Sequence, residues 1–313
     1  MPTRAASSDG LHPDSGSEAV CHESSTQGPR GRFAPSPTGD LHLGSLTTAL
    51  ASWLDIRQRG GQWWLRIDDI DPPREVPGAA RRILDALAQH GLEHDGDVVW
   101  QSQRGAQYAG AVDRLLAQGD AFYCSLSRRE LETLGGRHPG PPVAVQAGPD
   151  HAIRLAVPDH PITFQDRLQG PQRLNLAEAD GAFVIRRRDG LFAYQLACAL
   201  DDAEMGVTEV LRGADLLDST FRQLQVIDRL GLQAPTYGHL PVVVDKDGNK
   251  LSKSAGAARL SPEPATNLVT ALQLLGAETP ADLHRSPVQT ILDWGLSHWQ
   301  ADHLSGRRIL PML

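Results

Sequence analysis

The feature that most constrains the fold is an alternation of strand-like and helix-like segments that begins at Gly31. FAPSP reads as a short strand, and residues 45–59 read as the helix that follows it. WWLRIDD reads as the next strand and GAARRILDALAQH as the next helix. Because successive parallel strands need a crossover connection, this order predicts an α/β fold built on a parallel sheet.

Composition divides the 313 residues into five parts. The first part has almost no apolar side chains, and we expect it to be a disordered tail. The third is rich in Pro and Gly, and we expect it to be an inserted subdomain between two halves of the main domain. The fourth opens with an expected β-hairpin that turns at Asp189-Gly190. The predicted parts are residues 1–29, 30–118, 119–180, 181–260 and 261–313, the last being a short helical region.

Charge and cysteine usage limit the class of protein. The net charge is -8 and the pI is about 5.8, which does not indicate a nucleic-acid-binding protein overall. Contacts with a phosphate backbone would have to come from local runs such as Arg186–Arg188 or Arg128–Arg129, unless these runs simply form a solvated face. The cysteines Cys21, Cys124 and Cys198 are scattered, which fits a reducing cytoplasm. No apolar run approaches the roughly 20 residues that span a bilayer, so we expect a cytoplasmic protein with no membrane partner.

The stretch GRFAPSPTGDLHLGS leads directly into the first expected helix. Gly44 and Ser45 lie at the helix start, where unpaired N–H groups and the helix dipole favour an anion such as a nucleotide phosphate. His42 could donate to that phosphate or pack beneath an adenine, although a structural histidine in a Pro/Gly turn is an alternative. These three residues are therefore candidates for binding a nucleotide.

A second motif, KLSKS, lies in a polar loop after the strand-like LPVVV, far from the first motif along the chain. Lys250 and Lys253 flank a Leu-Ser pair, and two ammonium groups in a loop suit charge compensation on a reacting polyphosphate. Alone, KLSKS could be an ordinary surface loop. Combined with the earlier turn and helix start, it resembles the class I aminoacyl-tRNA synthetases.

Within that class the resemblance narrows to the glutamyl branch. This narrowing rests on RFAPSPTGDLHLGSL, LRIDDIDPPR, LRGADLL and KLSKS. The blocks DPPREVPGAA, GDVVWQSQR, RRRDGLFAYQLA and GVTEVLRGADLL are similar to those of the glutamyl-Q tRNA(Asp) synthetases, which are short paralogs of glutamyl-tRNA synthetases. The resemblance covers about residues 30–260. It implies a Rossmann-like parallel sheet with an inserted α/β acceptor-type subdomain and a short helical C-terminal region.

The resemblance also implies a ligase that activates L-glutamate with ATP, accompanied by Mg²⁺, without needing tRNA. The glutamyl group would then pass to the queuosine base of tRNA(Asp). Only about 60 residues follow Ser254, and an anticodon-reading domain of roughly 100 residues or more would not fit there. Two alternatives stay open: a truncated glutamyl-tRNA synthetase that charges a 3′ end, and a non-catalytic paralog that binds nucleotide or tRNA. No large apolar interface is evident, so we expect a monomer.

Family positions carried over onto this sequence give the expected site. His42, Gly44, Ser45 and Lys253 would bind ATP, and Lys253 beside Lys250 would neutralise charge that develops during adenylyl transfer. Two guanidiniums in motif blocks can each bind a carboxylate bidentately, and one of them would read the γ-carboxylate of glutamate. The sequence leaves open which one does so. The expected glutamate-binding residues are Arg32, Ala34, Ser36, Asp68, Tyr194 and Arg212.

Three of these positions have alternative interpretations. Asp68 stands where the family usually has Glu, which accepts a hydrogen bond from the substrate ammonium. Asp is one methylene shorter, and a bridging water could restore the contact. Tyr194 could be a core aromatic within FAYQLA, and Arg212 could form an ordinary surface salt bridge.

The zinc site of related proteins is incomplete here. Cys124 is present, but Leu126 stands in place of the second cysteine. His138 and Pro142 fall near the remaining two ligand positions. Two possible ligands cannot close a tetrahedral site, so we expect no structural zinc.

Overall fold

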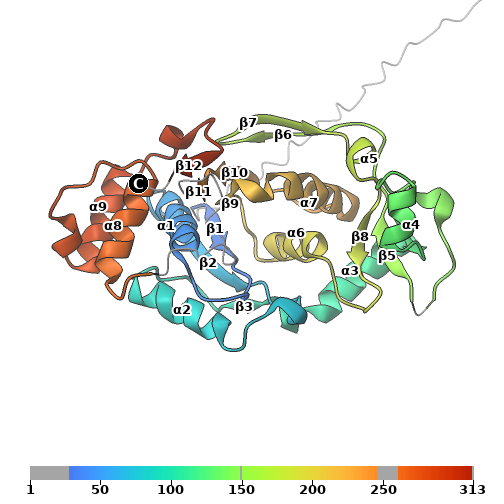
Figure 1. Ribbon diagram of the computed structural model, residues 1–313, viewed down its shortest axis with the longest axis horizontal. Coiled ribbons are helices and arrows are strands. Elements are labelled where there is room, and N and C mark those ends of the chain that lie inside the picture. The colour runs from blue at the N-terminus through green and yellow to red at the C-terminus, as the bar shows by residue number, and fades with distance from the viewer. Residues whose placement is uncertain (1–27, 149, 245–259, 312–313) are drawn as a thin grey trace, which may run out of the picture.

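The structure is a computed structural model that describes residues 28–148, 150–244 and 260–311. Apart from its last two residues, the expected N-terminal tail therefore lies outside the described chain. The central feature is a sheet of five strands (Figure 1). All its strand pairs are parallel, which confirms the expected α/β fold. In spatial order the strands are β10 (Thr236–Leu240), β9 (Glu209–Gly213), β1 (Arg30–Phe33), β2 (Gln62–Ile67) and β3 (Val99–Trp100).

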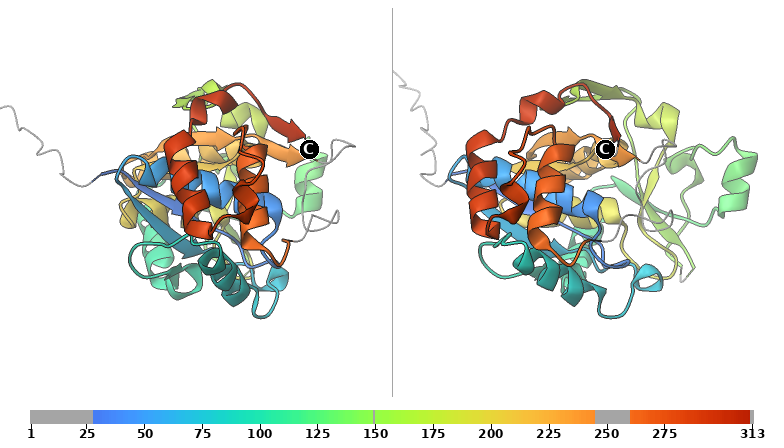
Figure 2. Two further views of the ribbon diagram at one scale, coloured as in Figure 1. Left: turned by 90° about the vertical axis from the view of Figure 1, so that its left-hand side faces the viewer. Right: turned by 60° about the vertical axis from the view of Figure 1, so that its left-hand side comes forward.

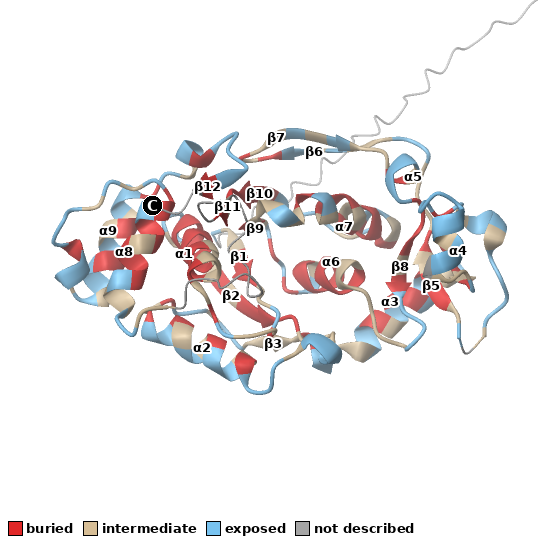
Figure 3. Ribbon diagram, in the orientation of Figure 1, coloured by how far each residue is buried: buried red, intermediate tan, exposed pale blue. Residues whose placement is uncertain are grey.

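Helices cover both faces of this sheet. Helix α1 (Leu43–Arg57) packs on β1 and β9, and α8 (Pro264–Leu274) packs on α1 from outside, with α9 (Val288–His298) beside it. Figures 1 and 2 show α8 and α9 at one end of the molecule. On the other side of the sheet, α6 (Tyr194–Glu204) packs against α7 (Leu217–Leu230). The buried apolar residues gather between these layers (Figure 3).

Helix α1 lies unusually close to β1 because Gly31 has no side chain. A Cβ at that position would lie 2.4 Å from Cγ1 of Ile56 on α1. The helix begins at Leu43, two residues before the expected start, because the side chain of His42 caps it. The close packing holds the C-terminal turn of α1 against the start of β1.

A second unit lies at the far end of the molecule from α9 (Figure 1). It contains an antiparallel sheet of three strands in the order β4-β5-β8, and a separate hairpin, β6-β7, extends from it towards β10. The elements are β4 (Ala121–Cys124), α4 (Arg128–Thr133), β5 (Ala152–Leu155), β6 (Ile162–Asp166), β7 (Gly170–Leu174), α5 (Leu176–Ala179) and β8 (Phe183–Arg186).

The remaining elements connect these units. Along the chain, helix α2 (Ala79–Gln89) connects β2 to β3, and α3 (Gly105–Ala117) connects β3 to β4. A short parallel pair joins β11 (Val242–Val244) to β12 (Ile309–Pro311). Short 3-10 helices cover Pro72–Arg74, Gln101–Gln103, Pro141–Val143, Ala214–Leu216, Leu283–Arg285 and Ala301–Leu304. Within the described ranges, every helix is too short or too polar to cross a bilayer.

The hairpin expected around Asp189-Gly190 is present but short. After β8, which also pairs with β5, the chain turns, and an antiparallel bridge joins Arg186 to Phe192. Backbone hydrogen bonds from Arg187 to Leu191 at 2.8 Å and from Ala193 to Ile185 at 2.9 Å flank this bridge. The chain then enters α6 at Tyr194. The buried residues of α6 are consecutive, from Leu196 to Asp202, so its sequence lacks the periodicity that would have distinguished this helix from a strand.

Candidate active site

The candidate site lies where the order of the parallel strands reverses. From β1 the chain crosses through α1 to β2, whereas from β9 it crosses through α7 to β10, in the opposite direction along the sheet. The loops after β1 and β9 therefore diverge, and such a switch point leaves a crevice at the carboxyl ends of the strands. A cavity of about 510 Å³ occupies this place. It is lined by six of the expected site residues, namely Ala34, Ser36, His42, Gly44, Ser45 and Tyr194.

The start of α1 forms one wall of the cavity. His42 accepts a hydrogen bond at Nδ1 from the backbone N–H of Ser45 at 3.3 Å, and its Nε2 lies 2.9 Å from the Ser45 hydroxyl. Gly44, Thr47 and Thr48 of the first turns also line the cavity. Backbone N–H groups at a helix N-terminus, together with the helix dipole, favour an anion there. The wall is therefore suited to a phosphate group.

Neither of the expected arginines lines the cavity, but each is buried and directly precedes a residue that does. Arg32 is only 3% exposed and precedes Phe33, whereas Arg212 is 4% exposed and precedes Gly213. Arg32 is already paired, because its Nε and Nη2 donate to the two oxygens of Asp202 at 3.1 and 3.3 Å. Its guanidinium is thus held by the protein before any ligand arrives.

Arg212 is held differently. Its Nε donates to Nε2 of His239 at 3.1 Å, and its Nη2 donates to the hydroxyl of Thr220 at 2.8 Å. Its Nη1 is buried and has no hydrogen-bond partner among the described residues. A buried guanidinium N–H without an acceptor is unfavourable, and a carboxylate is the acceptor that suits it best.

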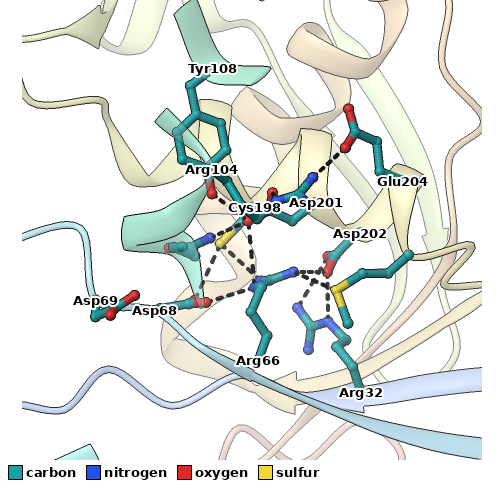
Figure 4. Close-up of polar contacts among 12 residues, drawn as sticks. Arg32, Arg66, Asp68, Asp69, Arg104, Tyr108, Cys198, Asp201, Asp202 and Glu204 are labelled. Atoms are coloured by element: carbon teal, nitrogen blue, oxygen red, sulfur yellow. Dashed lines mark hydrogen bonds and ion pairs between the residues drawn. The ribbon is translucent and has the colours of Figure 1, made fainter. Parts of the chain in front are cut away.

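A cluster of buried charges supports the floor of the site (Figure 4). Arg66, which is fully buried in β2, donates to Asp68 at 2.7 Å and to Asp202 at 2.6 Å. Burial alone would raise the pKa of the Asp202 carboxyl, but Arg32 and Arg66 lower it to about 2. Asp202 therefore stays ionised and fixes both guanidiniums.

The same cluster fastens α6 to α3 through Asp201. Its oxygens accept from the side-chain amide of Gln101 at 2.7 Å, from the hydroxyl of Tyr108 at 2.8 Å and from Nε of Arg104 at 2.6 Å. Arg104 also donates to Glu204. The buried carboxylate is thus satisfied by three donors, as a charge out of water requires.

Asp68 is placed in this cluster, with its side chain almost wholly buried. One oxygen accepts from Arg66, and the other lies 3.5 Å from Sγ of Cys198, whose thiol can donate to it. Burial raises the pKa of the Asp68 carboxyl, although Arg66 opposes that shift. The shorter side chain is thus held by the protein, at the end of β2.

Some expected residues are not brought into the cavity, or cannot be placed. Lys250 and Lys253 lie outside the described residues. The chain leaves the described part after Val244, and the two residues before it line the cavity. Cys124 and His138 lie in the unit of the three-stranded sheet.

Cys124 and His138 contact each other directly. Because the N–H of Gly140 donates to Nδ1 of His138 at 3.0 Å, the ring proton is on Nε2, which donates to Sγ of Cys124 at 3.2 Å. Burial, with Arg154 nearby, lowers the pKa of His138 to about 4. No group of three or more potential metal ligands occurs in the described part of the chain. The absence of zinc stays a prediction.

Sequence reasoning missed several residues that build the site. Arg66 could have been found, because a single arginine inside the apolar strand WWLRI needs a buried partner. Asp201 and Asp202 could have been found in the same way, since they follow the apolar run LACAL within one helix. Asp166 and His239 gave no comparable signal, because their pairing joins segments that are distant along the chain.

Comparison with known proteins adds the family. The chain matches the tRNA synthetases class I (E and Q), catalytic domain, over residues 30–139 and 143–273. It is 50% identical over 283 residues to a glutamyl-Q tRNA(Asp) synthetase of Ectopseudomonas mendocina, covering 90% of this chain and 96% of that protein. It is 47% identical over 282 residues to one of Pseudomonas syringae pv. tomato, with the same coverage of both chains.

A solved structure has the same fold. The glutamate tRNA ligase from Elizabethkingia meningosepticum, in complex with its amino acid, superposes with a TM-score of 0.76 at 24% identity, over 91% of this chain and 67% of that one. The order of the parallel strands, the cavity at their switch point and the sequence matches agree. The chain therefore belongs to the glutamyl-Q tRNA(Asp) synthetases, a family of ligases within the class I tRNA synthetases.

Proposed function

We propose that the protein activates L-glutamate with ATP and then transfers the glutamyl group to the queuosine base of tRNA(Asp). In the first step an oxygen of the α-carboxylate attacks the α-phosphorus of ATP, and the bond to pyrophosphate breaks. In the second step the queuosine base takes the glutamyl group from the adenylate and AMP leaves. The first step needs no tRNA in this proposal.

One observation carries the proposal: an anion-binding helix start and a buried, incompletely paired guanidinium meet at the same switch point. The cavity at the start of α1 suits a triphosphate, and the buried Arg212, whose neighbour Gly213 lines the cavity, lacks one acceptor among the described residues. A substrate that bears a carboxylate and reacts with a nucleotide satisfies both. ATP and glutamate have these properties.

The two arginines have different roles in this proposal. Arg212 binds the γ-carboxylate through its unpaired Nη1, because two nitrogens of Arg32 already donate to Asp202. Arg32 supports the acidic amino acid from beside it. Ala34, Ser36, Asp68 and Tyr194 complete the glutamate site in this proposal.

Catalysis consists of alignment and charge stabilisation, because no protein nucleophile is required. His42, Gly44 and Ser45 hold the triphosphate, and Mg²⁺ accompanies it. The cavity wall formed by Thr47, Thr48 and the helix N-terminus supplies hydroxyl and N–H donors for phosphate oxygens. Lys253, with Lys250 beside it, neutralises the negative charge that develops on the leaving pyrophosphate.

Glutamate-dependent ATP–pyrophosphate exchange, run with and without tRNA, tests activation. Exchange without tRNA is expected. Lys253→Ala should lower kcat about 10²- to 10³-fold, the usual effect of losing one transition-state donor, with a much smaller change in glutamate KM. A non-catalytic paralog would show no exchange, and unchanged exchange in the variant would remove Lys253 from the site.

Transfer is tested with labelled glutamate and tRNA(Asp) with and without queuosine. The label should appear in the nuclease fragment that contains the anticodon loop. Label on the 3′-terminal fragment would instead show a truncated glutamyl-tRNA synthetase.

We further propose that the enzyme works as a monomer in the cytoplasm. The proposed domain boundaries are residues 30–118 and 181–260 for the catalytic domain, with residues 119–180 inserted between them and 261–313 following. Light scattering at working concentration checks the monomer.

A further inference from the structure

A second buried dyad lies behind Arg212. Asp166 ends β6, and His239 lies in β10, the edge strand of the central sheet. Both residues are fully buried, and Oδ2 of Asp166 lies 2.5 Å from Nδ1 of His239. The catalytic steps above use neither residue, although a buried ion-pairing carboxylate and a buried imidazole are costly to keep out of water.

The hydrogen bonds determine which imidazole nitrogen is protonated. Nε of Arg212 is always a donor, so Nε2 of His239, 3.1 Å away, must accept. The ring proton therefore sits on Nδ1, where it donates to Asp166. Only this neutral tautomer satisfies both neighbours at once.

The other contacts fix the geometry around the ring. Oδ1 of Asp166 accepts from the backbone N–H groups of Leu168, Gln169 and His239 at 2.9, 2.8 and 3.1 Å. The carboxylate thus cannot rotate away from the imidazole. The ring of Tyr237 stacks on His239 at 6.2 Å, and the guanidinium carbon of Arg212 lies 5.3 Å from the centre of the same Tyr237 ring.

We infer that Asp166 and His239 are positioning residues that orient Arg212 so that its unpaired Nη1 is directed at the side-chain carboxylate of the amino acid substrate. With Nε held by His239 and Nη2 held by Thr220, the guanidinium plane has one orientation, and Nη1 is the nitrogen left for a ligand. The pair thereby contributes to selection of an acidic amino acid over its neutral amide. This inference rests on the proposed function, in which that amino acid is glutamate.

Asp166→Asn is the most specific test. The substitution keeps the oxygen that can accept the three backbone N–H groups, but replaces the acceptor opposite His239 by an NH₂ donor. His239 must then accept at Nδ1 and place its proton on Nε2, facing the N–H of Arg212. A carboxylate-to-amide change beside a histidine reverses the tautomer in the same way in serine proteases. The guanidinium should turn away from its present orientation.

The expected result is a rise in glutamate KM of about 10- to 100-fold, the effect of one misplaced charge-assisted hydrogen bond, measured by pyrophosphate exchange. The KM for ATP should stay near the wild-type value. The ratio of kcat/KM for glutamate over glutamine should fall by a similar factor, because the variant no longer presents Arg212 to the γ-carboxylate. A purely structural role would not change that ratio.

Asp55→Asn provides the matched control. Asp55 is also buried, and it pairs at 2.8 and 2.9 Å with Arg167, the neighbour of Asp166 in the same hairpin, without touching Arg212. It should lower the melting temperature but leave glutamate KM and the glutamate-to-glutamine ratio unchanged. If both variants change the KM for glutamate and for ATP equally, the dyad is only structural and the inference fails.

A second pair of variants decides the case if Asp166→Asn folds poorly. His239→Gln can place an oxygen near the former Nε2 and so retains an acceptor for Arg212, whereas His239→Leu cannot. Glutamate KM should rise less in the Gln variant than in the Leu variant. Equal KM values in both would overturn the inference. Absence of glutamate-dependent exchange in the wild type would instead refute the proposed function itself.

Discussion

Arg66 shows at the scale of one residue how this chain tolerates buried charge. Its guanidinium is fully buried, and its nitrogens reach Asp68, Asp202 and the sulfur of Cys198. Such a cluster is stable only while every member is paired, because removal of one partner leaves the others charged in a medium of low dielectric constant. The cluster therefore supports the site by fixing Arg32 indirectly, through their shared carboxylate.

Replacing Arg66 by methionine should lower the free energy of unfolding by about 3–5 kcal/mol, because Asp202 would lose one of its two guanidiniums and Asp68 its ion pair. The measurement is equilibrium urea unfolding at neutral pH. Arg81→Met is the control, since Arg81 forms an exposed pair with Asp85 and should change stability by less than about 0.5 kcal/mol. Similar values for both variants would contradict the role given to the cluster.

At the scale of elements, the close approach of α1 to β1 fixes the C-terminal end of the helix, and the N-terminal end of the same helix forms a wall of the cavity. Gly31 makes this approach possible. A shift of α1 at Ile56 would therefore also move the residues that line the cavity at the other end of the helix.

Gly31→Ala should lower the free energy of unfolding by about 1–3 kcal/mol and raise the KM for ATP, because the added methyl group would push Ile56 and α1 from the sheet. Chemical denaturation and pyrophosphate exchange measure the two effects. Gly110→Ala in α3 is the control: its Cβ would meet nothing within 4 Å, and alanine should stabilise that helix by roughly 0.5–1 kcal/mol. A wild-type KM for ATP in Gly31→Ala would show that the packing of α1 on β1 does not affect ATP binding.

The contact between His138 and β4 should make stability depend on pH. Burial and Arg154 lower the pKa of His138 to about 4, so the folded state favours the neutral ring. The contribution is fully present above the unfolded pKa of about 6.5 and is lost as pH falls from there towards 4, up to an order of 3 kcal/mol. His138→Gln should flatten the pH dependence of unfolding in this window. An unchanged slope would contradict the buried neutral histidine.

At the scale of the whole molecule, the proposed binding of tRNA by a chain of net charge -8 requires a local basic surface. A second cavity, of about 390 Å³, is lined by the three exposed arginines Arg186–Arg188 together with Tyr123 and His151. It lies in the unit of the three-stranded sheet, beside the chain that leads into α6. An aromatic ring among arginines suits a nucleic-acid backbone and an unstacked base.

Arg186→Ala and Arg188→Ala should therefore weaken transfer of glutamate to tRNA and leave pyrophosphate exchange unchanged. Each lost phosphate contact should lower the slope of log affinity against log salt by about one. Filter binding at several salt concentrations measures the slope, with Arg81→Ala as the control at an exposed arginine of another surface. If Arg186→Ala and Arg188→Ala transfer glutamate to tRNA as well as the control Arg81→Ala does, Arg186–Arg188 only form a solvated face and do not bind tRNA.

The sequence was sufficient for the sheet and for six cavity residues, but not for the partners beneath them. Strand-helix alternation predicts parallel strands, because it depends on local periodicity alone. The hairpin after β8 is shorter than expected, since LFAYQLA has the composition of a strand, whereas the chain becomes helical at Tyr194 and packs against α7. The pairing of Arg32 with Asp202, or of Asp166 with His239, depends on which distant segments meet, and local patterns do not contain that information.

The reversal of strand order has a consequence for synthesis on the ribosome. The inner edge of β1 pairs with β9, which is translated only after the entire second unit. During that interval the nascent chain exposes an unpaired strand edge, the kind of surface that recruits other chains. We therefore expect translating complexes stalled before residue 209 to bind chaperones, because the crevice lies at the junction of two halves that are synthesised at different times.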